Sequence, residues 1–175
     1  ALVVICTGFY ALAFETIYSR PHPAMEASSW INDHVPRGTV ILTDNHWDEG
    51  IPELYGYRVR QIPIYDNDNL EKMEWLADQL AGAEYLIFYS NRTYGSISRV
   101  PDRYPFSANY YQLLFAGKLG YELERTFTSY PNLLGLAFVH DPFTRANVPV
   151  PEHLNEHKPA LVTLNLGYAD DNVIG

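Results

Sequence analysis

Two polar segments hold the residues whose types and spacing can do chemistry. The first segment is Asp44-Asn45-His46-Trp47-Asp48-Glu49. Asp44, His46 and Asp48 alternate, so in an extended backbone they would share one face and could ligate a hard or borderline metal ion. A closed zinc site requires four ligands, however, and no second His/Asp cluster with ligand spacing follows. We therefore expect no bound transition metal in this chain.

Two further interpretations of the first segment remain open. In one, it is a solvated turn in which Trp47 folds onto the core and the acids cap neighbouring amides. In the other, it recognises a polar ligand: Trp47 offers a stacking face, and carboxylates accept hydrogen bonds. Under this second interpretation the candidate substrate-binding residues are His46, Trp47, Asp48 and Glu49.

The second polar segment runs from Ser90 to Ser96 and is followed by Arg99 and Arg103. Guanidinium groups bind oxyanions in a bidentate manner, so these arginines and Arg92 could clamp a phosphate. The alternative is that they form salt bridges with the acids of the first segment. The candidate substrate-binding residues here are Asn91, Arg92, Tyr94 and Arg99. The sequence has no Ser-His-Asp elbow, P-loop or GxGxxG motif.

Short apolar strands and amphipathic helices must position both segments. The predicted strands are Thr39–Thr43, Tyr57–Tyr65, Glu84–Ser90, Tyr121–Thr128 and Leu134–His140. The predicted helices cover Ala24–Val35, the stretch from Leu70 to Gly82, and the stretch from Ser107 to Gly117 or Gly120. This alternation predicts a three-layer α/β sandwich with a mainly parallel sheet, whose last two strands could be antiparallel.

Ligands bind outside the carboxyl ends of the strands in open α/β sheets. We therefore expect Thr39–Thr43 and Glu84–Ser90 to be neighbouring central strands, with both polar segments at one edge. The stretch from Asn91 to Pro105 is predicted to be a long loop, and Tyr110 and Tyr111 are expected to pack in the core or at its rim, with carbohydrate stacking as the lesser alternative.

Composition limits the partners of the chain. Its 175 residues are 47% hydrophobic, enough for one core, and its net charge is -9. Nucleic-acid binding relies on clustered Lys and Arg, so an acidic chain with scattered basic residues argues against a nucleic-acid partner. Cys6 is the only cysteine, which excludes an internal disulfide framework and a thiolate metal site.

The opening stretch Ala1–Phe14 carries no charge. It is the outer end of a transmembrane helix, a signal-peptide core or a buried helix, because a bilayer-spanning helix needs roughly 20 apolar residues. The missing basic region before it counts against a signal peptide. We expect a helix whose apolar side chains have no partner in the rest of the chain, with Glu15 and Arg20 at the water boundary.

The expected organisation has three parts. Residues 1–19 are the end of a transmembrane helix, residues 20–140 an extracytoplasmic α/β domain, and residues 141–175 an irregular C-terminal segment with several prolines. Both ends look cut, so we expect the chain to be part of a larger membrane protein located in the cell membrane.

Several longer motifs resemble a known family. They are Ala27-Ser28-Ser29-Trp30-Ile31, Pro36-x-Gly38, His46-Trp47-Asp48-Glu49-x-Ile51-Pro52, Ser90-Asn91-Arg92-x-Tyr94-Gly95-Ser96-Ile97-x-Arg99, Pro101-x-Arg103-Tyr104-Pro105 and Tyr110-Tyr111-x-Leu113-Leu114-Phe115. Together they resemble the C-terminal region of the "YYY" polytopic membrane proteins of bacteria and archaea, which are grouped loosely with the GT-C glycosyltransferases. The resemblance covers about residues 18–139.

A looser similarity concerns the catalytic subunit of oligosaccharyltransferase, in which a Trp-Trp-Asp motif recognises the acceptor peptide. The corresponding stretch here is His46-Trp47-Asp48. His46 replaces the first Trp, and Glu49-Gly50 replaces the Tyr-Gly that follows, so the peptide specificity is not implied. What the similarity implies is a loop that holds an acceptor near a membrane-embedded site.

The resemblance implies the extracytoplasmic domain of a GT-C-like glycosyltransferase, which moves a sugar from a polyprenyl-phosphate donor and uses this domain to help bind acceptor or donor. The implied partners are membrane lipid, the polyprenyl-phosphate sugar and an acceptor. The catalytic carboxylate of such enzymes lies in an early loop outside this fragment. No cofactor is expected here, although the whole protein could use a divalent metal ion. The alternatives are a non-catalytic binding or assembly domain and a hydrolase built on Asp44, His46 and Asp48.

Overall fold

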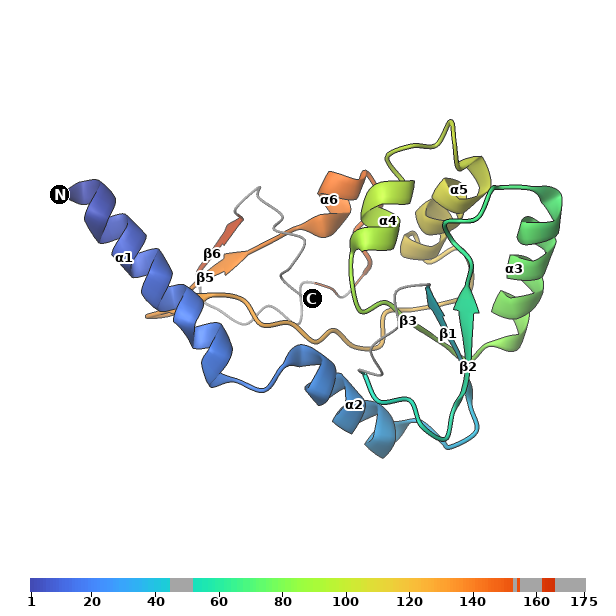
Figure 1. Ribbon diagram of the computed structural model, residues 1–175, viewed down its shortest axis with the longest axis horizontal. Coiled ribbons are helices and arrows are strands. Elements are labelled where there is room, and N and C mark those ends of the chain that lie inside the picture. Colours follow the sequence, from blue (N-terminus) through green and yellow to red (C-terminus); the bar gives the residue numbers. More distant parts are fainter. Residues whose placement is uncertain (45–51, 153, 155–161, 166–175) are drawn as a thin grey trace.

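The computed structural model describes residues 1–44, 52–152, 154 and 162–165 (Figure 1). The helices are α1 Leu2–Glu15, the 3-10 helix η1 Thr16–Ser19, α2 Pro23–His34, α3 Leu70–Gly82, α4 Arg92–Ile97, α5 Pro105–Phe115 and α6 Pro142–Ala146. The strands are β1 Val40–Asp44, β2 Arg58–Ile62, β3 Tyr85–Ile87, β4 Asn132–Leu133, β5 Leu136–Val139 and β6 Val162–Asn165. His46, Trp47, Asp48 and Glu49 lie outside the described residues.

The main sheet is parallel, with strand order β2-β1-β3. In its register Thr43 of β1 is paired with Gln61 of β2 and Ile87 of β3. The central strand β1 is buried along its whole length, as expected for a β-branched apolar run covered on both faces. The predicted mainly parallel sheet is confirmed, and β1 and β3 are neighbours as predicted. Of the two, only β1 is central, because β3 lies at the edge of the described sheet.

Helices cover both faces of this sheet. Successive side chains of a strand point to opposite faces, and Ile41 and Leu42 are both fully buried. Ile41 belongs to a core cluster with Ile31 of α2. Leu42 belongs to a second cluster with residues of α3, α4 and α5, including Leu76 and Tyr111. The chain therefore has the predicted three layers, with the sheet in the middle.

A second, smaller sheet has the strand order β4-β5-β6. Strands β4 and β5 are antiparallel, and β5 and β6 are parallel. Figure 1 shows this sheet beside α1, away from the main sheet. The strand predicted at Leu134–His140 is therefore present as β5, but it does not extend the main sheet.

The strand predicted at Tyr121–Thr128 is wrong, because this segment forms no ladder. Its alternating pattern of apolar and polar residues has a different cause: apolar side chains of an irregular segment pack on the domain. Tyr121 donates its hydroxyl hydrogen bond to the carbonyls of Leu80 and Ala83 at the end of α3, at 2.7 and 2.9 Å. The ring of Phe127 contacts Trp30 of α2, with ring centroids 6.1 Å apart.

The core continues beyond residue 140, into the segment predicted to be irregular. Ala146 and Val148 are buried in the same cluster as Leu42. Phe143 of α6 stacks on Tyr94 of α4, with centroids 5.5 Å apart and an interplanar angle of 11°. The loop predicted from Asn91 to Pro105 thus contains a short helix, which exists because α5 and α6 cover it.

The first turn of the opening helix α1 is exposed, and its later turns pack on the rest of the chain. Leu2, Val3, Val4 and Ile5 are exposed, as the prediction requires. The later turns do have partners, because Ala13 is fully buried and the ring of Tyr10 contacts Phe138 of β5 at 5.0 Å. The expectation that α1 has no partner is therefore wrong for its second half. Within the described residues, one helical stretch, Leu2–His34, is long and apolar enough to cross a membrane.

Candidate functional site

An open cleft of about 600 Å³ lies between α4 and α6. It is lined by Tyr65, Asn91, Arg92, Gly95, Ser96, Arg99, His140, Pro142, Arg145 and Ala146. Three of its residues come at or shortly after strand ends: His140 directly follows β5, Tyr65 lies in the connection that leaves β2, and Asn91 lies in the connection that leaves β3. In Figure 1 the arrow of β2 points toward α4 and α5, so the cleft lies at the carboxyl edge of the main sheet, as expected for a ligand site.

The cleft concentrates positive charge in an acidic chain. Arg92, Arg99 and Arg145 all line it, whereas the whole chain has a net charge of -9. Among the described residues, Arg92 and Arg99 are exposed and form no ion pair. The alternative prediction is salt bridges to the acids of the first segment. Of these, Asp44 accepts a hydrogen bond from Thr93, and Asp48 and Glu49 lie outside the described part of the chain. The described geometry fits an oxyanion, which guanidinium groups bind in a bidentate manner.

Asp44 forms the base of this edge. It ends β1 and is 1% exposed. The hydroxyl of Thr93, which is itself fully buried, donates a hydrogen bond to the Asp44 carboxylate. This contact ties the end of β1 to the first turn of α4 and so fixes Arg92 beside the strand end.

The charge of Asp44 acts on several tyrosine hydroxyls. Burial, and then the charge of Asp44, raise the pKa of the Tyr110 and Tyr111 hydroxyls well above 10.0. Burial also raises the pKa of the Tyr65 hydroxyl, although a hydrogen bond with Ser96 acts in the opposite direction. These phenols therefore stay protonated at neutral pH and contribute no negative charge to the cleft.

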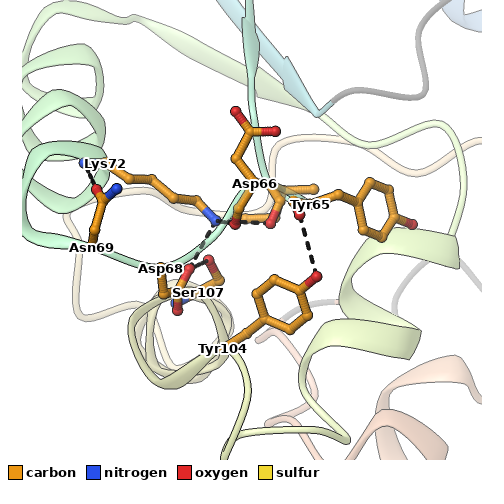
Figure 2. Close-up of polar contacts among 8 residues, drawn as sticks. Tyr65, Asp66, Asp68, Asn69, Lys72, Tyr104 and Ser107 are labelled. Carbon is orange, nitrogen blue, oxygen red and sulfur yellow. Dashed lines mark hydrogen bonds and ion pairs between the residues drawn. The ribbon is translucent and has the colours of Figure 1, made fainter.

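A buried polar network holds the wall that carries Tyr65 (Figure 2). Lys72 of α3 donates hydrogen bonds to the carbonyls of Ile64 and Asp66 at 2.9 and 2.8 Å, and pairs with the Asp68 carboxylate at 2.8 Å. Tyr104 donates its hydroxyl hydrogen bond to the Tyr65 carbonyl at 3.2 Å. The connection from β2 to α3 is therefore fixed at several consecutive residues.

Asp68 joins this network to α5. Its carboxylate accepts hydrogen bonds from the backbone N–H and the hydroxyl of Ser107, at 2.8 and 2.6 Å. Ser107 lies in the first turn of α5, where backbone N–H groups lack helical partners. Burial alone would raise the pKa of Asp68, but the hydrogen bonds from Lys72 and Ser107 outweigh it and lower the pKa.

The predicted site residues separate into three groups. Asn91, Arg92 and Arg99 line the cleft together. Tyr94 does not, because it is 6% exposed and its ring packs among Phe88, Phe115 and Phe143. In the described structure its ring packs in the core. The four residues of the first polar segment, His46 to Glu49, lie outside the described residues.

Sequence reasoning missed the contribution of the last part of the chain to the cleft. His140, Pro142 and Arg145 form one wall. His140 follows β5 directly, so the rule that sites gather at strand ends could have found it. Arg145 has no local signal, because its place depends on Phe143 packing against α4. Arg103, predicted with the other arginines, instead lies 5.2 Å from the ring centroid of Tyr104.

Comparisons and metal chemistry add two findings. No protein-family model, curated protein or solved structure matches the chain. Among the residues that the structure describes, no group of three or more His, Cys, Asp or Glu side chains is placed to hold a metal ion.

Proposed function

We propose that this chain is the extracytoplasmic, membrane-anchored domain of a GT-C-like glycosyltransferase, and that its cleft helps to bind the phosphate of a polyprenyl-phosphate sugar donor. One observation carries the proposal: three arginines line a cleft at the carboxyl edge of a parallel sheet in a chain of net charge -9. Such a local reversal of charge favours an anionic ligand.

The chemistry of the wall supports a phosphate with a polar group attached. Arg92 and Arg99 would hold the phosphate oxygens by charge-assisted hydrogen bonds. The Asn91 amide lines the same cleft and can donate to or accept from sugar hydroxyls. The Ser96 hydroxyl, which donates to the Arg92 carbonyl at 2.6 Å, can accept from them. The sugar-transfer chemistry itself would take place elsewhere in the whole protein, so the role of this domain is binding and orientation.

The opening helix supports the membrane part of the proposal. The side chains of Leu2, Val3, Val4 and Ile5 are between 66% and 78% exposed in the chain. Exposed apolar side chains around a whole helix are unfavourable in water and are typical of lipid contact. A lipid-linked donor would be held in the same membrane, which brings its phosphate to the surface on which the domain stands.

A second groove favours the alternative, a non-catalytic binding domain. It has a volume of about 490 Å³ and lies between α2 and residues 125–128. Trp30 and His34 stack there with ring centroids 4.8 Å apart, beside the acidic Glu26 and Asp33. Aromatic rings and carboxylates together are common in the recognition of polar ligands.

Binding of a short-chain prenyl phosphate by the full chain in detergent micelles tests the proposal. We expect the double variant Arg92→Ala/Arg99→Ala to weaken binding by about a hundredfold or more, since it removes two charge-assisted hydrogen bonds that contribute roughly 1.5–3 kcal/mol each. The matched control is Arg60→Ala/Lys118→Ala, which removes two positive charges from exposed positions away from the cleft.

The two double variants separate specific binding from overall charge. The control should bind like the parent chain, and the corresponding prenyl alcohol should bind no better to the parent than to the cleft variant. Equal weakening by both double variants, or equal binding of phosphate and alcohol, would overturn the proposed phosphate site.

A further inference from the structure

The tip of the β4–β5 hairpin carries an apolar side chain in a strained position. The loop between β4 and β5 is Leu134-Gly135, and both residues have positive φ, at 52° and 82°. Two-residue turns of this kind strongly favour Asn-Gly, because the left-handed region costs other residues roughly 1–2 kcal/mol. Leu134 is also 91% exposed. In water, Leu at this position has no compensating contact within the described chain.

Further exposed apolar side chains lie next to Leu134. The N–H of Val162 in β6 donates a hydrogen bond to the Gly135 carbonyl at 3.4 Å, so β6 begins beside the turn. Val162 and Leu164 alternate along β6, hence they point to the same face, and they are 55% and 45% exposed. Leu134, Val162 and Leu164 together define what we term the hairpin patch.

Direct contacts fix the hairpin against α1. The N–H of Asn132, the first residue of β4, donates to the Thr16 hydroxyl at 3.2 Å. The rings of Phe9 and Tyr10 contact Phe138 of β5, with centroids 6.3 and 5.0 Å away. Figure 1 shows the hairpin crossing α1, with its tip beyond the helix. The tip therefore lies at the level of the second half of α1.

That level of α1 is rich in aromatic rings. Tyr10, Phe14 and Tyr18 contact one another in sequence, with centroids 6.3 and 5.9 Å apart, and all three are at least 36% exposed. Tyr and Trp are enriched where a helix passes from hydrocarbon to water. Leu2 to Ile5 precede this level and are exposed, as expected for the part in hydrocarbon.

We propose that the hairpin patch enters the membrane interface beside α1, so that the domain contacts the lipid bilayer at two points. This inference rests on the membrane anchoring in the proposed function. The occupant is lipid, because the patch lies beside α1, which begins the stretch Leu2–His34 that is long and apolar enough to cross a membrane. Burial in the acyl boundary also gives Leu134 the apolar contact that offsets the strain of its turn. Two contacts would restrict the tilt of the domain relative to the membrane.

Depth-dependent quenching by nitroxide lipids tests the proposal in the full chain, reconstituted into phosphatidylcholine–phosphatidylglycerol vesicles. The only native cysteine is first removed by Cys6→Ser, and a fluorescent label is then attached through Leu134→Cys. Val3→Cys labels the apolar start of α1. Tyr55→Cys labels an exposed aromatic position outside α1 and the hairpin, since Tyr55 is 70% exposed.

We expect the labels at Leu134 and Val3 to lose fluorescence to nitroxide lipids, and the label at Tyr55 to keep it. Quenching at Val3 with a Leu134 label that behaves like the Tyr55 label would overturn the hairpin contact while leaving the anchor intact. No quenching at Val3 would overturn the anchor, and the inference with it. Loss of fluorescence at Leu134 only when a quencher is carried by a second copy of the chain would assign the patch to self-association instead.

Val162→Cys provides a second probe of the same patch if Leu134→Cys disturbs the turn. Thermal unfolding in detergent identifies such a disturbance. Leu134→Asn adds an independent measurement, because Asn tolerates the left-handed region. It should leave stability in detergent unchanged or higher, and it should increase hydrogen exchange at the turn only in vesicles. Unchanged exchange in vesicles would count against the lipid contact.

Discussion

Lys72→Met removes the charged end of a buried side chain while keeping most of its apolar length. Lys72 is 8% exposed, and its ammonium group donates to two carbonyl oxygens and one carboxylate oxygen at 2.8–2.9 Å. After the substitution the Asp68 carboxylate, whose side chain is 1% exposed, keeps the Ser107 hydrogen bonds but has lost its counter-charge. The variant therefore leaves a charge buried without its counter-ion.

Removing one partner of a buried ion pair costs roughly 3–5 kcal/mol. Asp68→Asn should cost less, about 1.5–3 kcal/mol, because Lys72 keeps its two carbonyl acceptors and Asn can still accept from the Ser107 N–H. The double variant should lower the free energy of unfolding by less than the sum of the two single variants. It contains neither the Lys72 ammonium nor the Asp68 carboxylate, so no buried charge is left without its partner. The expected order of destabilisation is thus Lys72→Met above Asp68→Asn.

Urea unfolding of the full chain and these variants in one detergent, followed by far-UV circular dichroism, measures these differences. Lys118→Met is the matched control, because Lys118 is exposed and should change the free energy of unfolding little. A cost for Lys72→Met below about 1 kcal/mol, the range of exposed pairs, would refute the structural role given to the network. A double variant whose loss of unfolding free energy equals the sum of the two single losses would also refute that role.

Three further predictions concern pH, the first polar segment and metal. Because the folded pKa of Asp68 is lowered, its contribution to stability is present above the unfolded value of about 4 and is lost as pH falls below it; acid titration of unfolding should show a smaller loss for Asp68→Asn. Trp47→Ala and Asp48→Asn in the whole protein should reduce sugar transfer, by about tenfold to a hundredfold for Asp48→Asn, with melting temperatures near that of the parent. A large fall in melting temperature for Trp47→Ala together with full activity for Asp48→Asn would favour the solvated-turn interpretation. Elemental analysis should find no stoichiometric zinc, and zinc that disappears with His46→Ala would favour the hydrolase instead.

The main sheet could be predicted because its signals are local. The run from Val40 to Thr43 is β-branched or apolar throughout, and such a run fits a strand covered on both faces. The amphipathic stripe from Leu70 to Gly82 identified α3 in the same way. The sequence of each of these elements therefore shows on its own which faces are buried.

Strand β4 and helix α4 could not be predicted because their stability depends on distant contacts. Strand β4 has two residues, Asn132 and Leu133, and is held by β5 and by Thr16 of η1. Helix α4 has six residues within a segment rich in Arg and Pro, and it is covered by Phe143 from far along the chain. Isolated helices this short are unstable, so local propensity gives little indication of them.

Sequence reasoning anticipated only part of the candidate cleft, because only some of its residues have a local signal. Asn91, Arg92 and Arg99 were found because they follow a recognisable strand. Tyr94 lies among them in sequence, but the helical turn directs it to the core while Arg92 and Ser96 face the cleft. Spacing in a loop cannot distinguish these directions, whereas a helix separates them onto different faces.

Photocrosslinking of the whole protein in membranes with a photoreactive polyprenyl phosphate tests the central claim most directly. Peptide mapping should place the label on residues of the cleft, in the stretches from Asn91 to Arg99 and from His140 to Arg145, and Arg92→Ala/Arg99→Ala should remove most of it. The matching polyprenol without phosphate should not label these stretches. Labelling confined to α1, or equal labelling of the cleft by phosphate and alcohol, would contradict a phosphate-binding role for this domain.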